Sequence, residues 1–391
     1  LADLYLRLAE LNVEEARYHY FIAYEGTKRR ERSVTSVQAR LLKNQAIGIY
    51  KRILDEFPNY SDKDKVLFFV AHEYRELGEY PDMLKYLERV IAEHDVSVYR
   101  NEALLVVGDY YFDRSELKNS EKYYKRILTS PESPSHGMAR YKLAWVRINE
   151  EDMKGALKLF EDTIEGLNKL EEAQASNPGT PGAGKKIDLR REALSDMVFP
   201  YTEVHKKPDV TQAINYFRRL ADSRTAYLAS MSKLAKRWFV KGEYNLASQV
   251  YRELLALGAE DDDTLEWARR LYDGASKGQQ FQYVAKDVNI LSQIGARRFY
   301  DWRIPEQERD HLFKEFEAYC RDLSTKAQTA AAKNTDMKLF ELAGDAYENY
   351  LKFFAAAPAS QEIRQNLADS RFAAKQYFLA GRAYEGVIEG V

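Results

Sequence analysis

Small and large side chains recur along this chain at a spacing that indicates helices. At many points a small residue is followed four positions later by an aromatic or large apolar residue, and residues four apart share a face of an α-helix. The pairs are Ala46/Tyr50, Met83/Leu87 (with a bulky first member), Ser120/Tyr124, Ala156/Phe160, Ala213/Phe217, Ala247/Tyr251, Ala343/Tyr347 and Ala380/Tyr384. Each pair therefore predicts the buried stripe of an amphipathic helix.

The pairs recur at nearly constant intervals. Their first members lie 37, 37 and 36 residues apart between positions 46 and 156, 34 apart from 213 to 247, and 37 apart from 343 to 380. A second pattern precedes several of them: a large residue, then Leu or Val beside Ala or Gly, then an aromatic. It reads Leu67-x2-Val70-Ala71-x2-Tyr74, Leu104-x2-Val107-Gly108-x2-Tyr111 and Met231-x2-Leu234-Ala235-x2-Trp238, with Arg147 and Arg371 at the aromatic place in two further units. Two apolar stripes per interval, with Gly78 and Gly242 placed to end the first helix, predict a helix–turn–helix repeat.

The two patterns together resemble the tetratricopeptide repeat (TPR), whose ~34-residue unit reads W-x2-L-G-x2-Y…A-x3-F…P. The resemblance covers residues 40–167, 190–260 and 336–391. It implies an all-α fold, a TPR-like helix–turn–helix repeat solenoid that winds as a right-handed superhelix. Each helix pair leaves one apolar face open, so only stacking of neighbouring units buries a continuous core.

Four short sequence segments show a more specific resemblance, to one group of TPR proteins. They are Leu4–Leu11, Asp64–Phe68, Gly108–Phe112 and Ala139–Trp145. These phrases are similar to those of long TPR proteins of the Gram-negative cell envelope, which include periplasmic or lipid-anchored components of the motility machinery of gliding and predatory bacteria. The resemblance implies a periplasmic scaffold held near the outer membrane.

The repeat spacing divides the chain into consecutive segments. One helix is expected over 1–25, with Leu4, Leu8, Leu11 and Ala16 on its apolar face. The segments are N-terminal helices with a first half-repeat at 1–60, a TPR-like array at 61–167, a flexible loop insertion at 168–188 (rich in Pro, Gly and small residues), a TPR-like array at 189–260, degenerate helical repeats at 261–335, and C-terminal TPR-like repeats at 336–391. In the degenerate segment we expect a helix from Glu306 to Leu323, then a weakly packed helix over 327–332.

Composition narrows the class of function. Lys and Arg number 59 and Asp and Glu 61, a formal net charge of −2, which argues against a nucleic-acid partner. The longest apolar run, at 66–71, is far shorter than the ~20 residues that a membrane span needs. One cysteine and six histidines leave little material for a disulfide framework, a metal centre or acid–base catalysis. We therefore expect a soluble, non-catalytic protein with no cofactor, metal or small-molecule substrate.

Three short motifs call for a chemical interpretation. The segment 179–186 fits most of the P-loop pattern, but Lys186 stands where a hydroxyl should hold magnesium and no strand precedes it, so we interpret it as a linker. The His72-Glu73 pair lacks the second histidine of a zinc-protease motif, because Glu76 occupies that position. Cys320 lies among acidic residues, which raise a thiol pKa, and is expected to pack inside a helix.

Two charged runs have structural interpretations. The acidic run at 260–263 lacks the ligand spacing of a calcium loop and is expected to begin a helix, where carboxylates favour the helix dipole. The basic run at 28–32 is expected to be a solvated loop, the alternative being a contact with an anionic surface.

The resemblance also places a partner-binding groove. In TPR proteins the concave wall is formed by first-helix residues that do not pack against the second helix. The corresponding positions here are Phe68, His72, Arg75, Leu105, Asp109, Phe112, Tyr141, Trp145 and Asn149. Adjacent Phe112, Tyr141 and Trp145 would anchor a peptide segment, since aromatics are enriched at binding hot spots. The alternative is that the chain's own superhelix or N-terminal helix covers these side chains.

One TPR subclass binds the C-terminal carboxylate of chaperone tails through lysines, asparagines and an arginine on this wall. Those positions hold Glu102, Leu105, Asp109, Tyr141 and Trp145 here, so that clamp is absent.

The expected function is therefore a protein–protein interaction scaffold of the bacterial envelope that links subunits of a larger machine, gliding motility being one such machine. The chain starts at Leu1 rather than methionine, which is compatible with a removed leader or lipid anchor that associates it with the membrane. The alternative is a cytosolic TPR adaptor or regulator that binds a partner peptide in the same groove. An enzyme with a helical-repeat body is a third reading, to be revived by a bound metal or nucleotide.

Overall fold

The computed structural model describes residues 1–26, 37–131, 133–176, 188–206, 208–258 and 261–389, and within these ranges all regular structure is helical. The chain divides into two compact units, Leu1–Leu189 (unit 1) and Arg190–Val391 (unit 2). The prediction of an all-α fold is confirmed.

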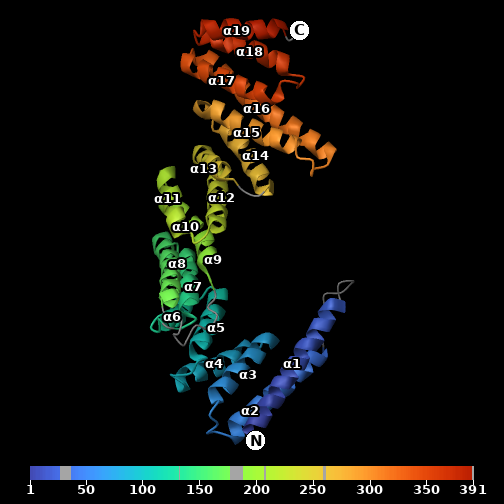
Figure 1. The fold of residues 1–391 in the computed structure, drawn as a ribbon. Helices are drawn as coiled ribbons and strands as arrows, with labels where there is room; N and C mark the ends of the chain where they lie inside the picture. The colour runs from blue at the N-terminus through green and yellow to red at the C-terminus, as the bar shows by residue number, and fades with distance from the viewer. Residues whose placement is uncertain (27–36, 132, 177–187, 207, 259–260, 390–391) are drawn as a thin grey trace. The chain divides into compact units, whose positions relative to one another are not determined.

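Unit 1 is a series of helix pairs that follow one another along the chain (Figure 1). Within each pair the two helices pack side by side, and the second helix of one pair packs against the first helix of the next. The pairs are α1 (Ala2–Gly26) with α2 (Val37–Glu56), α3 (Lys63–Leu77) with α4 (Tyr80–Glu93), α5 (Arg100–Asp113) with α6 (Leu117–Ile127), and α7 (His136–Asn149) with α8 (Met153–Ser176). This arrangement is the helix–turn–helix repeat that the spacing predicts.

Unit 2 repeats the arrangement with more variation in helix length. Two short helices, α9 and α10, stand before α11, and a 3₁₀ turn, η2, precedes α15. The elements are α9 (Arg190–Asp196), α10 (Val198–Val204), α11 (Val210–Leu220), α12 (Arg224–Val240), α13 (Tyr244–Leu257), α14 (Asp261–Lys277), η2 (Phe281–Tyr283), α15 (Val284–Phe299), α16 (Glu306–Asn334), α17 (Met337–Phe354), α18 (Ser360–Ala373) and α19 (Tyr377–Glu389).

The predicted small/large pairs form the core of the repeats. Every member is at most 2% exposed except Tyr384, which is half-buried. The small member lets the neighbouring helix approach closely, as Gly108 does in the first helix of its unit. A Cβ at Gly108 would lie 2.5 Å from Cε1 of Tyr124, so the phenol ring rests directly on the α5 backbone. The packing of α5 on α6 therefore depends on the absence of a side chain at this position.

The two predicted glycine turns are confirmed. Gly78 and Gly242 have φ of +78° and +80°, in the left-handed region that glycine adopts without strain. The Gly78 amide donates to the Arg75 carbonyl, and the Gly242 amide donates to the Phe239 carbonyl. Both contacts close a first helix and turn the chain toward the second.

The apolar face predicted for the first helix is wrong. Leu4, Leu8 and Leu11 are exposed, with Leu4 at 71%, and only Ala16 of the predicted face is buried. The buried stripe is Ala2, Leu6, Ala9, Val13 and Ala16. Both stripes have helical spacing, and the one with smaller side chains faces inward because it lets α1 lie close against α2.

The degenerate segment packs more tightly than expected. Helix α16 begins at Glu306 as predicted, but it continues to Asn334, well beyond Leu323. Ala327 and Ala331, which we expected in a weakly packed stretch, are completely buried in the core of unit 2. Alanine packs well here because α15 and α17 both lie against α16.

Three other predicted segments have different outcomes. Helix α14 begins at Asp261, which confirms the acidic run as a helix start. Helix α8 continues to Ser176, so its last turns occupy the beginning of the segment 168–188 that we expected to be loop. The P-loop-like segment 179–186 and the basic run 28–32 lie outside the described residues.

Candidate protein-binding groove

The nine predicted groove residues lie on the first helices of three consecutive pairs in unit 1. Helix α3 carries Phe68, His72 and Arg75, helix α5 carries Leu105, Asp109 and Phe112, and helix α7 carries Tyr141, Trp145 and Asn149. Of these, Arg75 and Asn149 are exposed, Phe68 is buried and the other six are half-buried. The structure thus places all nine on the predicted helices but gives them different surroundings.

The α3 residues line cavities. A cavity of about 290 Å³ lies between α1 and α3, with Phe68 and His72 among its lining residues. A much smaller one, about 10 Å³, is lined by residues of α3, α4 and α5, with Arg75 among them. Phe68 also stacks on Tyr99, with ring centroids 5.1 Å apart, which fixes it as part of the wall. This part of the predicted groove is hollow.

On α5, Asp109 is engaged within the chain. Its Oδ1 accepts a hydrogen bond of 2.5 Å from the Tyr124 hydroxyl of α6 and lies 3.2 Å from Nζ of Lys142 on α7. The carboxylate therefore joins the two helices of one pair and the first helix of the next. Leu105 and Phe112, its neighbours on the same helix, pack at the edge of the unit 1 core.

On α7, the two aromatic side chains contact the second helix of their own pair. The rings of Tyr141 and Trp145 meet the Phe160 ring edge-on, with centroids 5.6 and 6.3 Å apart. The expectation that they avoid the second helix is wrong, because they cover the edge of a fully buried aromatic ring. Asn149 donates its side-chain amide to the Trp145 carbonyl at 2.8 Å.

Helix α1 supplies cavity residues that the sequence did not indicate. The cavity between α1 and α3 is lined by Glu10, Val13, Glu14, Arg17, Tyr50, Phe68, Phe69, His72 and Glu73. The α1 members are spaced at one helical face, which was visible in the sequence. That α1 lies beside Phe68 and His72 agrees with the alternative in which the N-terminal helix covers groove positions. The sequence did not indicate which face of α1 does so.

Two residues that line this cavity have shifted pKa values. Burial acts to raise the pKa of Glu10, but hydrogen bonds and charge from Lys65 and Arg7 outweigh it and the pKa is lowered. Burial, followed by the charges of Glu73 and Glu10, raises the pKa of Tyr50, whose phenol therefore stays neutral. The cavity wall thus combines the ionised carboxylate of Glu10 with the neutral phenol of Tyr50.

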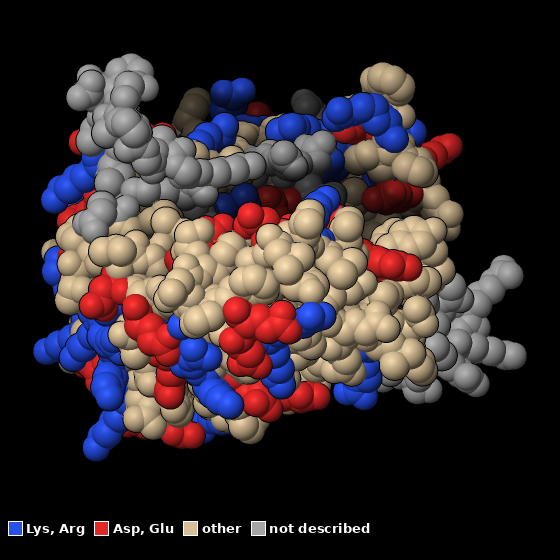
Figure 2. All heavy atoms as spheres, turned by 90° about the horizontal axis from the view of Figure 1, so that it is seen from below, with Lys and Arg blue, Asp and Glu red and all other residues tan. Residues whose placement is uncertain are grey.

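A second cavity, of about 430 Å³, lies beside the first. It is lined by Arg17, Tyr20, Ala39, Arg40, Lys43, Glu76 and Leu77, so Arg17 borders both cavities. Lys43 bridges Glu76 and Glu73 from this side. Elsewhere acidic and basic side chains are interspersed over the face drawn in Figure 2, with uncharged areas between them.

Other chemistry is limited in the part of the chain that the structure describes. No group of three or more His, Cys, Asp or Glu is arranged there to hold a metal ion. Cys320 is fully buried, its thiol lies 3.7 Å from the Val288 carbonyl, and burial raises its pKa well above the ordinary value. The prediction that Cys320 packs inside a helix is confirmed. Among the described helices, none has the length and apolar character to cross a membrane.

Comparisons with known proteins give structural likenesses alone. No family model matches the sequence, and no curated protein matches it. A crystal structure of MamA is 18% identical, with 53% of this chain and 99% of that chain covered and a TM-score of 0.33. A putative kinesin light chain from Podospora anserina with nearly identical TPR-like repeats is 14% identical, covering 55% and 95%, with a TM-score of 0.37.

A third likeness spans nearly the whole chain. It is a signal transduction ATPase with numerous domains from Pyrococcus horikoshii, which has a tetratricopeptide repeat sensor. The identity is 14%, the TM-score is 0.34, and 99% of this chain matches 54% of that protein. The fold assignment rests on the helix pairs and their buried stripes. The chain is an all-α protein of TPR-like helix–turn–helix repeats.

Proposed function

We propose that this chain is a non-catalytic scaffold that binds protein partners along the first helices of the pairs in unit 1. The observation that carries the proposal is the cavity of about 290 Å³ between α1 and α3, at a predicted groove position. Concave, mostly preformed sites with a few polar groups are typical of specific binding. Half-buried Leu105 and Phe112 on α5 would continue the contact surface beyond it.

The finer proposal is that the partners are subunits of a bacterial envelope machine, with gliding motility as the example that the sequence phrases suggest. Its support is the resemblance of Leu4–Leu11, Asp64–Phe68, Gly108–Phe112 and Ala139–Trp145 to envelope TPR proteins. A cytosolic adaptor that uses the same groove is the alternative, and cell fractionation separates the two.

The experiment is crosslinking and affinity capture of the full-length protein, expressed from its own gene in its own cells. The test variant carries Arg75→Ala and Phe112→Ala, two groove positions that lie outside the fully buried core. The control is Lys85→Ala, at an exposed position on the second helix α4. We expect the groove variant to lose partners that the control retains. Equal capture by both variants would contradict groove binding, and partners confined to the cytosol would contradict the envelope proposal.

A further inference from the structure

Glu73 is a buried carboxylate with unused hydrogen-bonding capacity beside the cavity between α1 and α3. It is 3% exposed, and its Oε2 accepts no hydrogen bond. The nearest cation is Nζ of Lys43, 3.5 Å from Oε2, and this ammonium also contacts Glu76. On the other oxygen, Nδ1 of His72 lies 3.7 Å from Oε1. A buried carboxylate is costly unless it is both paired and hydrogen-bonded, and Glu73 has the ion pair with Lys43 but no hydrogen bond to Oε2.

The other charged groups of the cavity favour a cationic occupant. Glu14 is exposed and has Arg7 at 3.7 Å, while Glu10 is held by Lys65 at 3.0 Å. Arg17 is the one guanidinium in the lining, and it borders the neighbouring cavity as well. An anion here would meet Glu10, Glu14 and Glu73, and a neutral apolar group would leave Glu73 with its ion pair to Lys43 but no hydrogen bond to Oε2.

The uncharged lining is aromatic. Tyr50, Phe68 and Phe69 contribute rings to the wall, and Nζ of Lys65 already lies 5.3 Å from the Phe69 ring centroid. Aromatic faces attract cations, and a planar guanidinium both stacks on rings and donates to a carboxylate in fixed geometry. The cavity of about 290 Å³ therefore offers the two features that an arginine side chain uses.

We propose that this cavity receives an arginine side chain of the bound partner, which donates to the Glu73 carboxylate and lies against the half-buried side chain of Phe69. The inference rests on the proposed function, because it names the chemistry that the partner presents to the groove. It makes the partner segment basic at the point where it meets α1 and α3.

The test uses a defined probe rather than a natural partner. A fluorescein-labelled alanine-based decapeptide with a central Arg-Arg pair is titrated with the full chain and followed by fluorescence anisotropy. The matched peptide carries citrulline at both positions, which keeps the planar shape but removes the charge and replaces one terminal NH₂ donor group with a carbonyl acceptor. We expect the arginine peptide to bind at least about tenfold more tightly, the range of one hydrogen bond to a charged group. Equal affinity of the two peptides would overturn the proposal.

Single-residue variants test whether the preference for the arginine peptide arises at this cavity. Glu73→Gln should reduce the arginine preference to near unity, whereas Glu93→Gln, which removes an ion-paired carboxylate from α4, should leave it unchanged. If Glu73→Gln lowers the melting temperature, the exposed Glu14→Gln is used instead, with a several-fold loss expected. A preference that survives in both folded variants would overturn the proposal. Partners that crosslink to the groove without arginine dependence would leave the proposed function standing and refute only this inference.

Discussion

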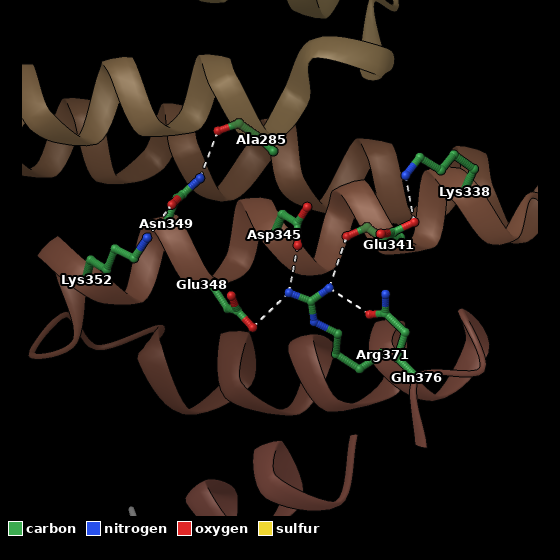
Figure 3. A network of polar contacts seen from close by, with 9 residues as sticks. All are labelled: Ala285, Lys338, Glu341, Asp345, Glu348, Asn349, Lys352, Arg371 and Gln376. Carbon is green, nitrogen blue, oxygen red and sulfur yellow. Dashed lines mark hydrogen bonds and ion pairs between the residues drawn. The ribbon is translucent and has the colours of Figure 1, made fainter. Parts of the chain in front are cut away.

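Arg371 of α18 donates a 2.7 Å hydrogen bond to Asp345 of α17, from the position where the repeat pattern elsewhere has an aromatic residue. The guanidinium also lies 2.8 Å from Glu348 and donates to Gln376, as Figure 3 shows. Arg147 makes the equivalent contact with Glu121 of α6, and in both cases the partners are 26 residues apart. In these two units an ion pair to the preceding helix therefore takes the place of an aromatic side chain.

Removing the Arg371 side chain should destabilise unit 2. Its side chain is only 4% exposed, and its Nε lies 3.0 Å from the position that a Cβ on Gly344 of α17 would take. We expect Arg371→Ala to cost about 2–3 kcal/mol, the range for hydrogen bonds to charged groups together with lost packing. Arg147→Ala should cost less, because that side chain is 24% exposed. Urea unfolding followed by circular dichroism measures both, and a larger loss for Arg147→Ala would contradict this account.

The buried pair between Arg252 of α13 and Asp287 of α15 should be sensitive to loss of one partner. The two groups form paired hydrogen bonds of 2.6 and 2.8 Å, and their side chains are 5% and 1% exposed. Asp287→Ala leaves a buried guanidinium without its carboxylate and should cost about 3–5 kcal/mol. The double variant Arg252→Met with Asp287→Leu should be more stable than Asp287→Ala. Calorimetric melting compares them, and the reverse order would contradict the claim that the unpaired guanidinium is what destabilises Asp287→Ala.

Two glycine-to-alanine substitutions should have opposite effects. At Gly108 the new methyl group would overlap the buried Tyr124 ring, so we expect a loss of about 1–3 kcal/mol from overpacking. At Gly48, inside α2, a Cβ meets nothing within 4 Å, and alanine should stabilise the helix by roughly 0.5–1 kcal/mol. Melting temperatures of the two single variants test the prediction. A neutral Gly108→Ala would show that Tyr124 can move away without cost.

Stability should fall in acid, with Glu121 and Glu203 among the contributors. Hydrogen bonds from Lys125 and Arg147 lower the pKa of Glu121 below its ordinary value of 4.5, and Lys241 and Arg237 do the same for Glu203. A lowered pKa means that the folded state binds the proton more weakly than the unfolded chain. The stabilisation is therefore complete above about pH 4.5 and is lost as pH falls through the folded-state pKa.

The Glu121→Gln variant tests the contribution of this carboxylate to the pH dependence of stability. Replacing Glu121 with glutamine should reduce stability at neutral pH and flatten the decline on acidification. Urea titrations at several pH values between 3 and 7 measure this slope. An unchanged slope in Glu121→Gln would mean that its ion pairs add nothing to the pH dependence.

The sequence predicted which segments form helices better than it predicted which side of each helix is buried. Ala46/Tyr50 and similar pairs are buried as expected, because helical spacing and side-chain size determine which residues meet in a hairpin. For α1 two stripes satisfied the same spacing, and only the close approach of α2 selects the one that contains Ala9 and Val13. Ala327 and Ala331 were misjudged for a related reason, since small residues look weakly packed until a neighbouring helix is known.

The candidate site was predictable only in part. The positions on α3, α5 and α7 follow from the repeat, and Phe68 and His72 do line a cavity. Tyr141 and Trp145 instead cover Phe160, because neighbouring aromatic rings gain by packing together. Glu73 and the α1 residues needed tertiary structure, since the sequence offered the N-terminal helix only as one alternative cover of the groove and did not indicate its face.

The most direct test of groove binding is photo-crosslinking at a single site in living cells. The photoreactive amino acid p-benzoyl-phenylalanine replaces Phe112 of α5 in the groove or, as the control, exposed Lys122 of the second helix α6. We predict that protein partners crosslink to the Phe112 position and that the Lys122 position gives none. Partners that crosslink at Lys122 and not at Phe112 would contradict the account and place binding on the second helices.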